Sequence, residues 1–168
     1  MTTARSVLLS VRPQFARALL NGTKTAEVRR RFPELAAGTV LYVYASSPSK
    51  QVIGTLRTTA VHRVPPRTVW GRFARMIGID RGYLDAYLHG VDRASIIEVG
   101  APETWLRPVT LHELRLHVAV EPPQSYRYLS DAQAAQLESA RRLADGGARD
   151  RSAAGRPRTI AAAAMVDA

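Results

Sequence analysis

Short apolar runs with β-branched and aromatic residues alternate along this chain with segments whose apolar residues recur at helical spacing. The apolar runs predict strands at residues 6–11, 24–31, 39–46, 51–64, 94–100 and 116–120. Within the longest of these strands, Gly54 indicates a β-bulge or a close approach of another part of the backbone. Pro65 and Pro66 end that strand, because proline cannot donate a hydrogen bond to a neighbouring strand.

The segments of helical spacing predict four helices. They lie at residues 13–20, 68–77, 80–89 and 130–143, with a further short capped turn or helix within 108–115. Pro13 suits the first turn of its helix, and Asn21-Gly22 ends that helix with residues that tolerate the left-handed conformation. Asp80 and Ser130 are expected N-caps, because their side chains can accept hydrogen bonds from the first turn.

The order of these elements predicts an α+β fold with a mostly antiparallel, curved sheet. Helices do not alternate regularly with strands, which argues against a doubly wound parallel sheet. Residues 1–130 are expected to form one domain, which a C-terminal helix follows at 131–145. Residues 146–168 lack aromatic residues and apolar periodicity, and we therefore expect a disordered tail there.

Basic residues outnumber acidic ones, and the formal net charge is +10. Residues 1–128 hold 18 of the basic side chains but nine acidic ones, so the excess lies in the predicted domain. A basic folded surface attracts phosphate groups and suggests RNA, DNA or a nucleotide-like small molecule as partner. A solvated surface with a high arginine content is an equal alternative, and the sequence leaves the oligomeric state open.

Composition also argues against several kinds of chemistry. The chain has no cysteine, which excludes disulfides and thiol chemistry. The four histidines are scattered, and no carboxylate lies at ligand spacing from His112 and His117, so neither a metal nor a cofactor is expected. No apolar run approaches the roughly 20 residues that span a membrane, and we expect a cytoplasmic protein without a membrane partner.

One short segment concentrates the candidate chemistry. Residues 21–29 read Asn-Gly-Thr-Lys-Thr-Ala-Glu-Val-Arg and directly follow the first predicted helix. Lys24 is one of two lysines among 24 basic residues, in a chain that otherwise uses arginine. An ammonium group can lose its proton on burial and a guanidinium cannot, so a lysine here favours a role that needs a lysine.

This segment resembles the Gly-x-Lys-x-x-Glu-x-Arg pattern of ASCH domains, which belong to the PUA-like superfamily. Residues 44–48 and 52–54 fit the same family, and residues 122–129 are similar to the ending of a bacterial subgroup. The resemblance spans residues 6–130. It implies a small β-barrel with flanking helices and a cleft that the motif lines beside the first helix. The predicted helices within 68–89 then form a helical insertion that covers the barrel.

The resemblance also implies a range of functions. ASCH domains are associated with the binding of RNA or other nucleic acids. Some members hydrolyse an acylated cytidine nucleoside, and others have been assigned ribonuclease activity. The hydrolytic members carry a threonine where this chain has Glu27, and this difference argues against the amidohydrolase activity.

Alternation along the predicted strand places four polar side chains on one face, namely Thr25, Glu27, Arg29 and Arg31. Lys24 and Glu27 converge only if Lys24 lies in the turn before regular pairing begins, which Gly22 permits. In a cleft, Glu27 can hold Lys24 charged as a ligand for phosphate or carbonyl groups. Alternatively, a buried Lys24 can lose its proton and act as a nucleophile or base. The remaining alternative is a surface ion pair, worth about 0–1 kcal/mol.

Further ligand-binding candidates surround the expected cleft, namely Thr25, Arg29, Arg31, Ser46, Ser47, Tyr126 and Arg127. Arg29 can bond a phosphate or a base edge through two N–H groups at once. Ser46 and Ser47 offer polar contacts at the rim, or form an ordinary turn. Tyr126 and a neighbouring tyrosine flank Arg127 and suit base stacking, unless both rings belong to the core.

Three functions follow from these observations. The first is an ASCH-type module that binds RNA or a nucleotide-like ligand in a basic cleft. The second is an amidohydrolase or nuclease acting on an acylated nucleoside or on RNA, with Lys24 and Glu27 as catalytic residues. The third is a DNA-binding transcription regulator, because residues 74–84 have the spacing of a helix-turn-helix, although the second helix is poor in base-reading side chains.

Overall fold

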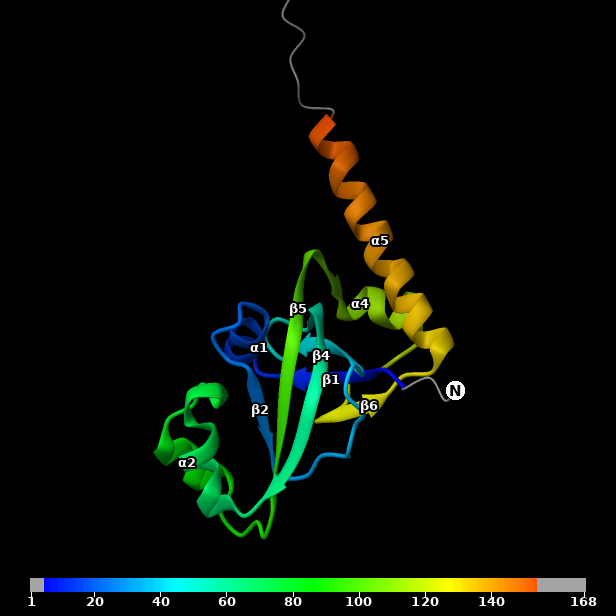
Figure 1. Ribbon diagram of the computed structural model, residues 1–168. Helices are drawn as coiled ribbons and strands as arrows, with labels where there is room; N and C mark the ends of the chain where they lie inside the picture. Colours follow the sequence, from blue (N-terminus) through cyan, green and yellow to red (C-terminus); the bar gives the residue numbers. More distant parts are fainter. Residues whose placement is uncertain (1–4, 154–168) are drawn as a thin grey trace, which may run out of the picture.

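Six strands form one mixed sheet in the computed structural model, which describes residues 5–153, with side chains up to Asp145 apart from Ala144. The strands are β1 (Val7–Val11), β2 (Ala26–Arg29), β3 (Val40–Ala45), β4 (Gln51–Val64), β5 (Ala94–Thr110) and β6 (Tyr126–Tyr128). Their order across the sheet is β2-β5-β4-β3-β1-β6. β1 and β3 pair in parallel, and the other neighbouring strands pair antiparallel. The sheet curves into a half-barrel (Figure 1), and the predicted α+β fold is confirmed.

The two long strands β4 and β5 are hydrogen-bonded along most of their length. Pairing extends along β4 from Gln51 to Val64 and contains three register shifts. Gly54 lies at one of these shifts, where a Cβ atom would stand 2.3 Å from the carbonyl oxygen of Glu103. The close backbone approach that the sequence predicts at Gly54 is therefore present.

Helices pack around the curved sheet (Figure 1). They are α1 (Pro13–Leu20), α2 (Pro66–Ile77), α3 (Arg81–Tyr87), α4 (Leu111–Glu113) and α5 (Asp131–Ala153), with a π-helix, η1, at Leu114–Val118. α2 and α3 form the helical insertion between β4 and β5. Gly78 follows α2 with a φ of 61°, which glycine adopts without strain. Asp80 caps α3 by accepting a hydrogen bond from the Tyr83 N–H.

Two expected boundaries in the second half of the chain differ from the structure. The strand expected at residues 116–120 is wrong. Thr110 and Glu113 form a capping box that starts α4, and the helical turns continue through η1. The strand expected to end at Gly100 continues to Thr110, because β5 stays paired with β4 through a polar stretch that breaks the apolar pattern.

Two further boundaries concern β2 and the C-terminal helix. β2 starts at Ala26 and not at Lys24, because the preceding residues form a turn. α5 ends at Ala153 and not at residue 145, since a helix that has formed adds one hydrogen bond for each residue that extends it. The rest of the expected disordered tail, residues 154–168, lies outside the described residues.

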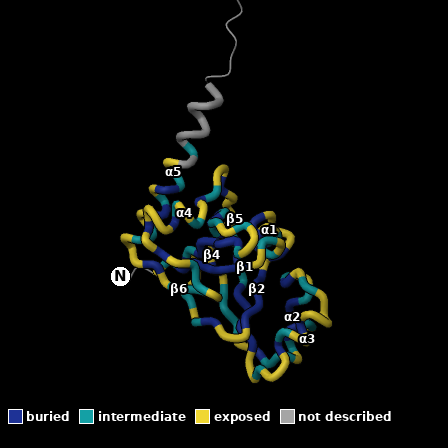
Figure 2. Tube along the Cα trace, turned by 180° about the vertical axis from the view of Figure 1, so that it is seen from behind, coloured by how far each residue is buried: buried dark blue, intermediate teal, exposed yellow. Residues whose placement is uncertain are grey.

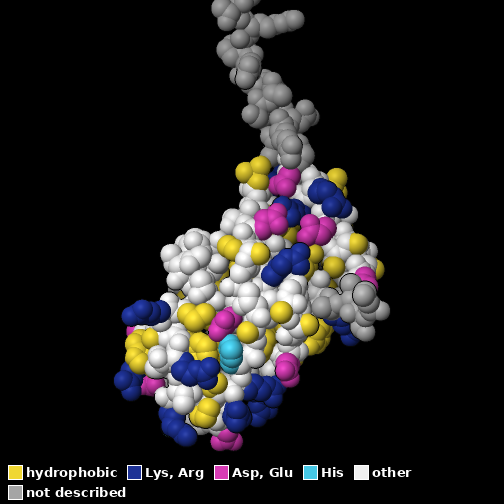
Figure 3. Space-filling view, viewed as in Figure 1, with side chains coloured by type: hydrophobic (Ala, Val, Ile, Leu, Met, Phe, Trp, Pro, Cys, Tyr) yellow, Lys and Arg dark blue, Asp and Glu magenta, His cyan; other side chains and the backbone are white. Residues whose placement is uncertain are grey.

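Buried residues follow the strands of the sheet (Figure 2). The buried apolar residues form three clusters. One lies between α1 and the sheet and includes Leu19 and Leu41. The second lies under α5 and includes Trp105 and Leu137, and the third packs the helical insertion onto β2 and β5 around Phe73. Among the residues that the structure describes, no helix is both long and apolar enough to cross a lipid bilayer. On the face shown in Figure 3, Lys and Arg side chains gather at the lower end, over the helical insertion and the adjoining ends of β4 and β5.

Candidate functional site

Lys24 occupies the turn between α1 and β2. Gly22 adopts a φ of 80°, and the Lys24 N–H donates to the carbonyl of Ala18 at 3.0 Å, so the turn folds back onto the end of α1. Regular strand pairing begins two residues later. The alternation of side chains between the two faces of a strand therefore does not apply to Lys24. Its side chain lies on the same side of the chain as that of Glu27 and contacts it.

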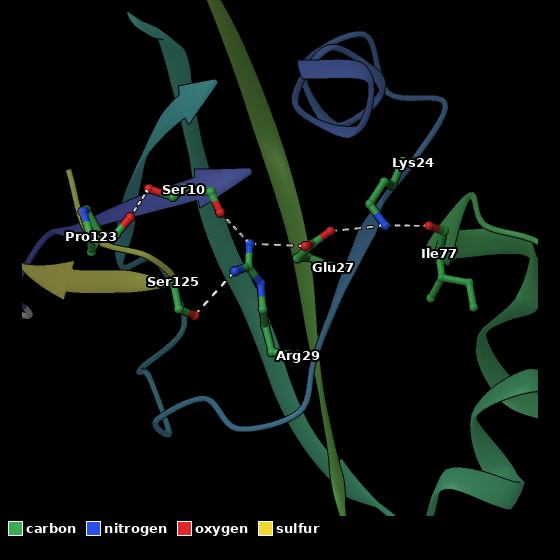
Figure 4. A network of polar contacts seen from close by, with 7 residues as sticks. All are labelled: Ser10, Lys24, Glu27, Arg29, Ile77, Pro123 and Ser125. Carbon is green, nitrogen blue, oxygen red and sulfur yellow. Dashed lines mark hydrogen bonds and ion pairs between the residues drawn. The ribbon is translucent and has the colours of Figure 1, made fainter. Parts of the chain in front are cut away.

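Three charged side chains form a buried row along β2 (Figure 4). The Lys24 ammonium lies 3.1 Å from Glu27 Oε2, and Arg29 Nη2 lies 3.1 Å from Glu27 Oε1. The exposed fractions of Lys24, Glu27 and Arg29 are 2%, 7% and 9%. This burial excludes the alternative of a solvated surface ion pair, and each charge depends on its neighbour for stabilisation.

Contacts with three other segments hold the row in place (Figure 4). Lys24 Nζ donates to the carbonyl of Ile77 at the end of α2. Arg29 donates through Nη2 to the carbonyl of Ser10 on β1 at 2.7 Å, and through Nη1 to Ser125 Oγ at 3.3 Å. Ser125 directly precedes β6, which is the edge strand opposite β2. Arg29 therefore links the two edges of the half-barrel through side-chain contacts.

Burial is the main influence on the charge of Lys24. It lowers the pKa of Lys24 from the ordinary value of a lysine, while the charge and hydrogen bond of Glu27 oppose this effect and the Arg29 charge adds a smaller lowering. The ammonium has three N–H groups, of which Ile77 and Glu27 engage two. Nζ also lies 5.4 Å from the centre of the Phe15 ring. Because of the lowered pKa, a neutral amine becomes accessible at a lower pH than for an exposed lysine.

The row lines a hollow of about 320 Å³, which we call the charged hollow. Its other residues come from β1, α1, β2, α3 and several loops, and they include Phe15, Tyr83 and Tyr87. The Tyr83 and Tyr87 rings are nearly parallel, with centroids 6.3 Å apart and an interplanar angle of 15°. The Phe15 ring meets Tyr83 edge-on at 6.1 Å. Aromatic rings beside a charged row suit a flat ligand with a polar edge.

The sequence does not predict this aromatic lining. Tyr83 and Tyr87 lie on α3, which the helix-turn-helix interpretation assigns to DNA reading. Their separation of four residues is the one signal that both rings share a helix face. The packing of the insertion onto β2, which turns this face toward Lys24, is a tertiary contact that the sequence pattern does not reveal.

The other predicted site residues lie in different places. Ser46 lines the charged hollow together with the row. Arg31 and Tyr126 instead line a second hollow, in which the Tyr126 ring packs against Phe32 with centroids 4.8 Å apart. The structure thus separates Arg31 from Arg29, although the two residues were expected on one face of β2, because β2 ends at Arg29.

Three predicted residues line neither hollow. Thr25 and Ser47 are exposed, and Arg127 is half-buried and donates to the carbonyl of Glu121 at 3.2 Å. Their binding roles stay predictions. Within the part of the chain that the structure describes, no three His, Asp or Glu side chains lie close enough together to hold a metal ion.

The model of the ASCH domain family matches residues 9–108, so the protein belongs to the ASCH domain family. The ASCH domain-containing ribonuclease of Zymomonas mobilis is 29% identical over 136 residues, which cover 80% of this chain and 91% of that protein. The crystal structure of ASCH from Zymomonas mobilis has a TM-score of 0.76 at 30% identity, and the match covers 80% of this chain and 94% of that one.

A more distant structure supports the fold alone. A protein from Pseudomonas putida is 17% identical with a TM-score of 0.56, and the match covers 81% of this chain and 99% of that one. The predicted family and the PUA-like fold are confirmed. The Zymomonas relative is, by its name, a ribonuclease.

Proposed function

We propose that this protein binds single-stranded RNA by taking an unpaired base into the charged hollow. The observation that carries the proposal is the buried Lys24–Glu27–Arg29 row beside aromatic rings in a hollow of about 320 Å³. The ribonuclease relative and the net charge of +10 support RNA as the partner. Unstacked bases in single strands are the usual target of such sites, since both their faces and their edges are accessible.

The row offers hydrogen-bonding groups in the order donor, acceptor, donor, from the ammonium of Lys24, the carboxylate of Glu27 and the guanidinium of Arg29. The edge of uracil carries the complementary order, which is a carbonyl oxygen, an N–H and a second carbonyl oxygen. Cytosine and adenine place an unprotonated ring nitrogen at the central position, and that nitrogen would face the Glu27 carboxylate. We therefore expect uracil to bind in preference to cytosine and adenine.

Tyr83 supplies the stacking surface in this proposal. It lines the charged hollow and is 37% exposed, so its ring is accessible to a base without a change in the core. Stacking of a base on an aromatic ring contributes about 1–3 kcal/mol. Arg12 is exposed and also lines the hollow, and can bind the phosphate next to the bound base.

The test is fluorescence anisotropy with labelled oligouridylate, oligocytidylate and duplex DNA at several salt concentrations. We expect the wild type to bind oligouridylate most tightly and Tyr83→Ala to lose about tenfold in affinity. Leu116→Ala is the control, because Leu116 is 66% exposed and lies outside both the charged hollow and the hollow that Tyr126 lines. Equal affinities of these two variants would contradict the proposal. Tighter binding of duplex DNA would favour the transcription-regulator alternative.

Glu27→Gln tests the base preference with the same assay. Glutamine keeps the shape of the side chain but removes the negative charge that favours an N–H donor. We expect the preference for uridylate over cytidylate to fall by about tenfold or more. A preference that is unchanged in a variant shown to be folded by circular dichroism would remove Glu27 from base recognition.

A second candidate is hydrolysis of RNA, which the name of the Zymomonas relative favours. Lys24 is the residue of the row that can act as a base, because burial lowers its pKa. Lys24→Arg keeps the charge and removes the neutral amine. RNA cleavage that disappears in this variant while binding persists supports the hydrolase, and cleavage that persists excludes Lys24 as the base. Turnover of an acetylated cytidine tests the amidohydrolase in the same way.

A further inference from the structure

A second hollow of about 890 Å³ is lined in part by the residues that directly follow the charged row in the sequence, and we call it the arginine hollow. Four arginines from separate segments line it, namely Arg30, Arg31, Arg63 and Arg93. They come from the residues that follow β2, from the end of β4 and from the loop before β5. This region is part of the end of the molecule at which basic side chains gather (Figure 3).

The described lining of the arginine hollow carries an excess of positive charge. No described carboxylate forms an ion pair with any of the four arginines. Asp92 is the one acidic residue of the described lining. Elsewhere in the described chain, arginines such as Arg115 and Arg141 do pair with carboxylates. A concave surface with several uncompensated guanidinium groups attracts anions, above all phosphates.

Hydrogen bonds to backbone carbonyls orient three of these arginines. Arg30 donates to the carbonyl of Tyr87 at 2.9 Å, Arg63 to that of Phe32 at 3.1 Å, and Arg93 to that of Arg63 at 2.7 Å. Each bond engages one of the five N–H groups of a guanidinium. The side chains are thus positioned in advance, and the described residues leave most of their donors available to an anion.

A peptide bond and a hydrogen bond connect the linings of the arginine hollow and the charged hollow. Arg29 belongs to the charged row and Arg30 to the arginine hollow, so consecutive residues serve the two sites. The carbonyl of Tyr87, whose ring lines the charged hollow, accepts the hydrogen bond from Arg30. The linings of the two hollows are thus in direct contact at Arg30 and Tyr87.

We propose that the arginine hollow binds the phosphodiester backbone of the RNA strand whose base occupies the charged hollow. This inference rests on the proposed function and extends it, because it means that the protein binds polymeric RNA and not only a single nucleotide. The charged hollow selects the base, and the arginine hollow adds affinity that depends on salt and not on sequence.

The test compares Arg31→Gln/Arg93→Gln with the control Arg107→Gln/Arg142→Gln. Both double variants remove two positive charges, and the two control residues are exposed and lie outside both hollows. Binding of oligouridylate and of uridine monophosphate is measured as a function of salt. For the first variant we expect the slope of log affinity against log salt to fall by about 1.4, and the affinity for the oligonucleotide to fall about tenfold near 0.15 M salt.

Binding of uridine monophosphate should stay unchanged in both variants, because the charged hollow is intact. An oligonucleotide affinity that falls no further than in the control overturns the role of the arginine hollow and leaves the proposed function standing. A wild-type protein that binds neither ligand overturns both. Arg31→Lys provides a further check, since it keeps the charge and should retain the salt dependence of the wild type.

Discussion

Lys24 is a buried amine, and its burial makes the stability of the protein depend on pH. In the folded protein burial lowers its pKa from the ordinary value of 10.5, so the unfolded chain binds more protons between the two pKa values. The free energy of unfolding therefore rises with pH in this interval, by up to about 1.4 kcal/mol per pH unit. At a pH below both pKa values, Lys24 is charged in the folded protein, and the full cost of desolvating its ammonium group lowers the stability.

Comparison of the wild type with Lys24→Met isolates this effect. Tyr42, whose pKa is raised by burial and by Glu138, titrates in both proteins and cancels in the difference. In urea unfolding at increasing alkaline pH, we expect the wild type to gain stability relative to the variant as the pH approaches 10.5. A difference that stays constant would show that the Glu27 carboxylate balances the effect of burial, and one that falls with pH would show that it outweighs burial.

The sequence predicts the charged row of the candidate site but not its aromatic lining, and the reason is physical. Lys24, Glu27 and Arg29 lie within six residues, and a glycine before them marks the turn that lets the first two meet. The aromatic lining depends on α3 folding onto β2 from a distant part of the chain. Local spacing reports which residues share a face, and it does not report what that face contacts.

At the level of elements, the approach of β4, β5 and α1 depends on a glycine. A Cβ atom at Gly54 would lie 2.3 Å from the carbonyl oxygen of Glu103 and 2.9 Å from the methyl groups of Leu20. The carbonyl belongs to the sheet backbone and cannot move without loss of pairing. We expect Gly54→Ala to lower the free energy of unfolding by at least about 1–3 kcal/mol in urea titrations.

Gly71→Ala is the control for this substitution. Gly71 is exposed on α2, and no atom would lie within 4 Å of an added Cβ. Alanine in a helix interior should therefore raise the free energy of unfolding by about 0.5–1 kcal/mol. If both variants lose stability equally, the clash at Gly54 is not the reason for its destabilisation.

The elements that the sequence predicts well are those whose pattern and end signals agree. Residues 51–64 alternate and end at a proline pair, and β4 has these bounds. The segment 116–120 has an apolar pattern as well, but a capping box at Thr110 and Glu113 directs the chain into helical turns. Where a capping interaction and a short apolar run compete, the local hydrogen bonds decide the element.

For the whole molecule, the apolar cluster under α5 and the charged hollow lie in different places, so we expect stability and binding to depend on different residues. The charged hollow lies between the half-barrel and the helical insertion, while α5 covers a separate cluster around Trp105. The apolar spacing of the C-terminal helix predicts that Leu137 and Ala140 share a face, and both are buried in this cluster. The spacing does not show which surface that face packs against. That surface is formed by strands, and their order is set by pairing between distant parts of the chain.

This division predicts that a cavity under α5 weakens the fold and leaves RNA binding intact. Leu137 is fully buried, so Leu137→Ala should lower the free energy of unfolding by about 2–5 kcal/mol, measured by urea unfolding. Leu143→Ala is the control, because Leu143 is 71% exposed and its truncation removes little buried surface. At temperatures where both variants are folded, their affinities for oligouridylate should equal that of the wild type. A loss of affinity in folded Leu137→Ala would mean that the cluster under α5 is coupled to the charged hollow through the strands between them. Stability and RNA binding would then depend on the same residues.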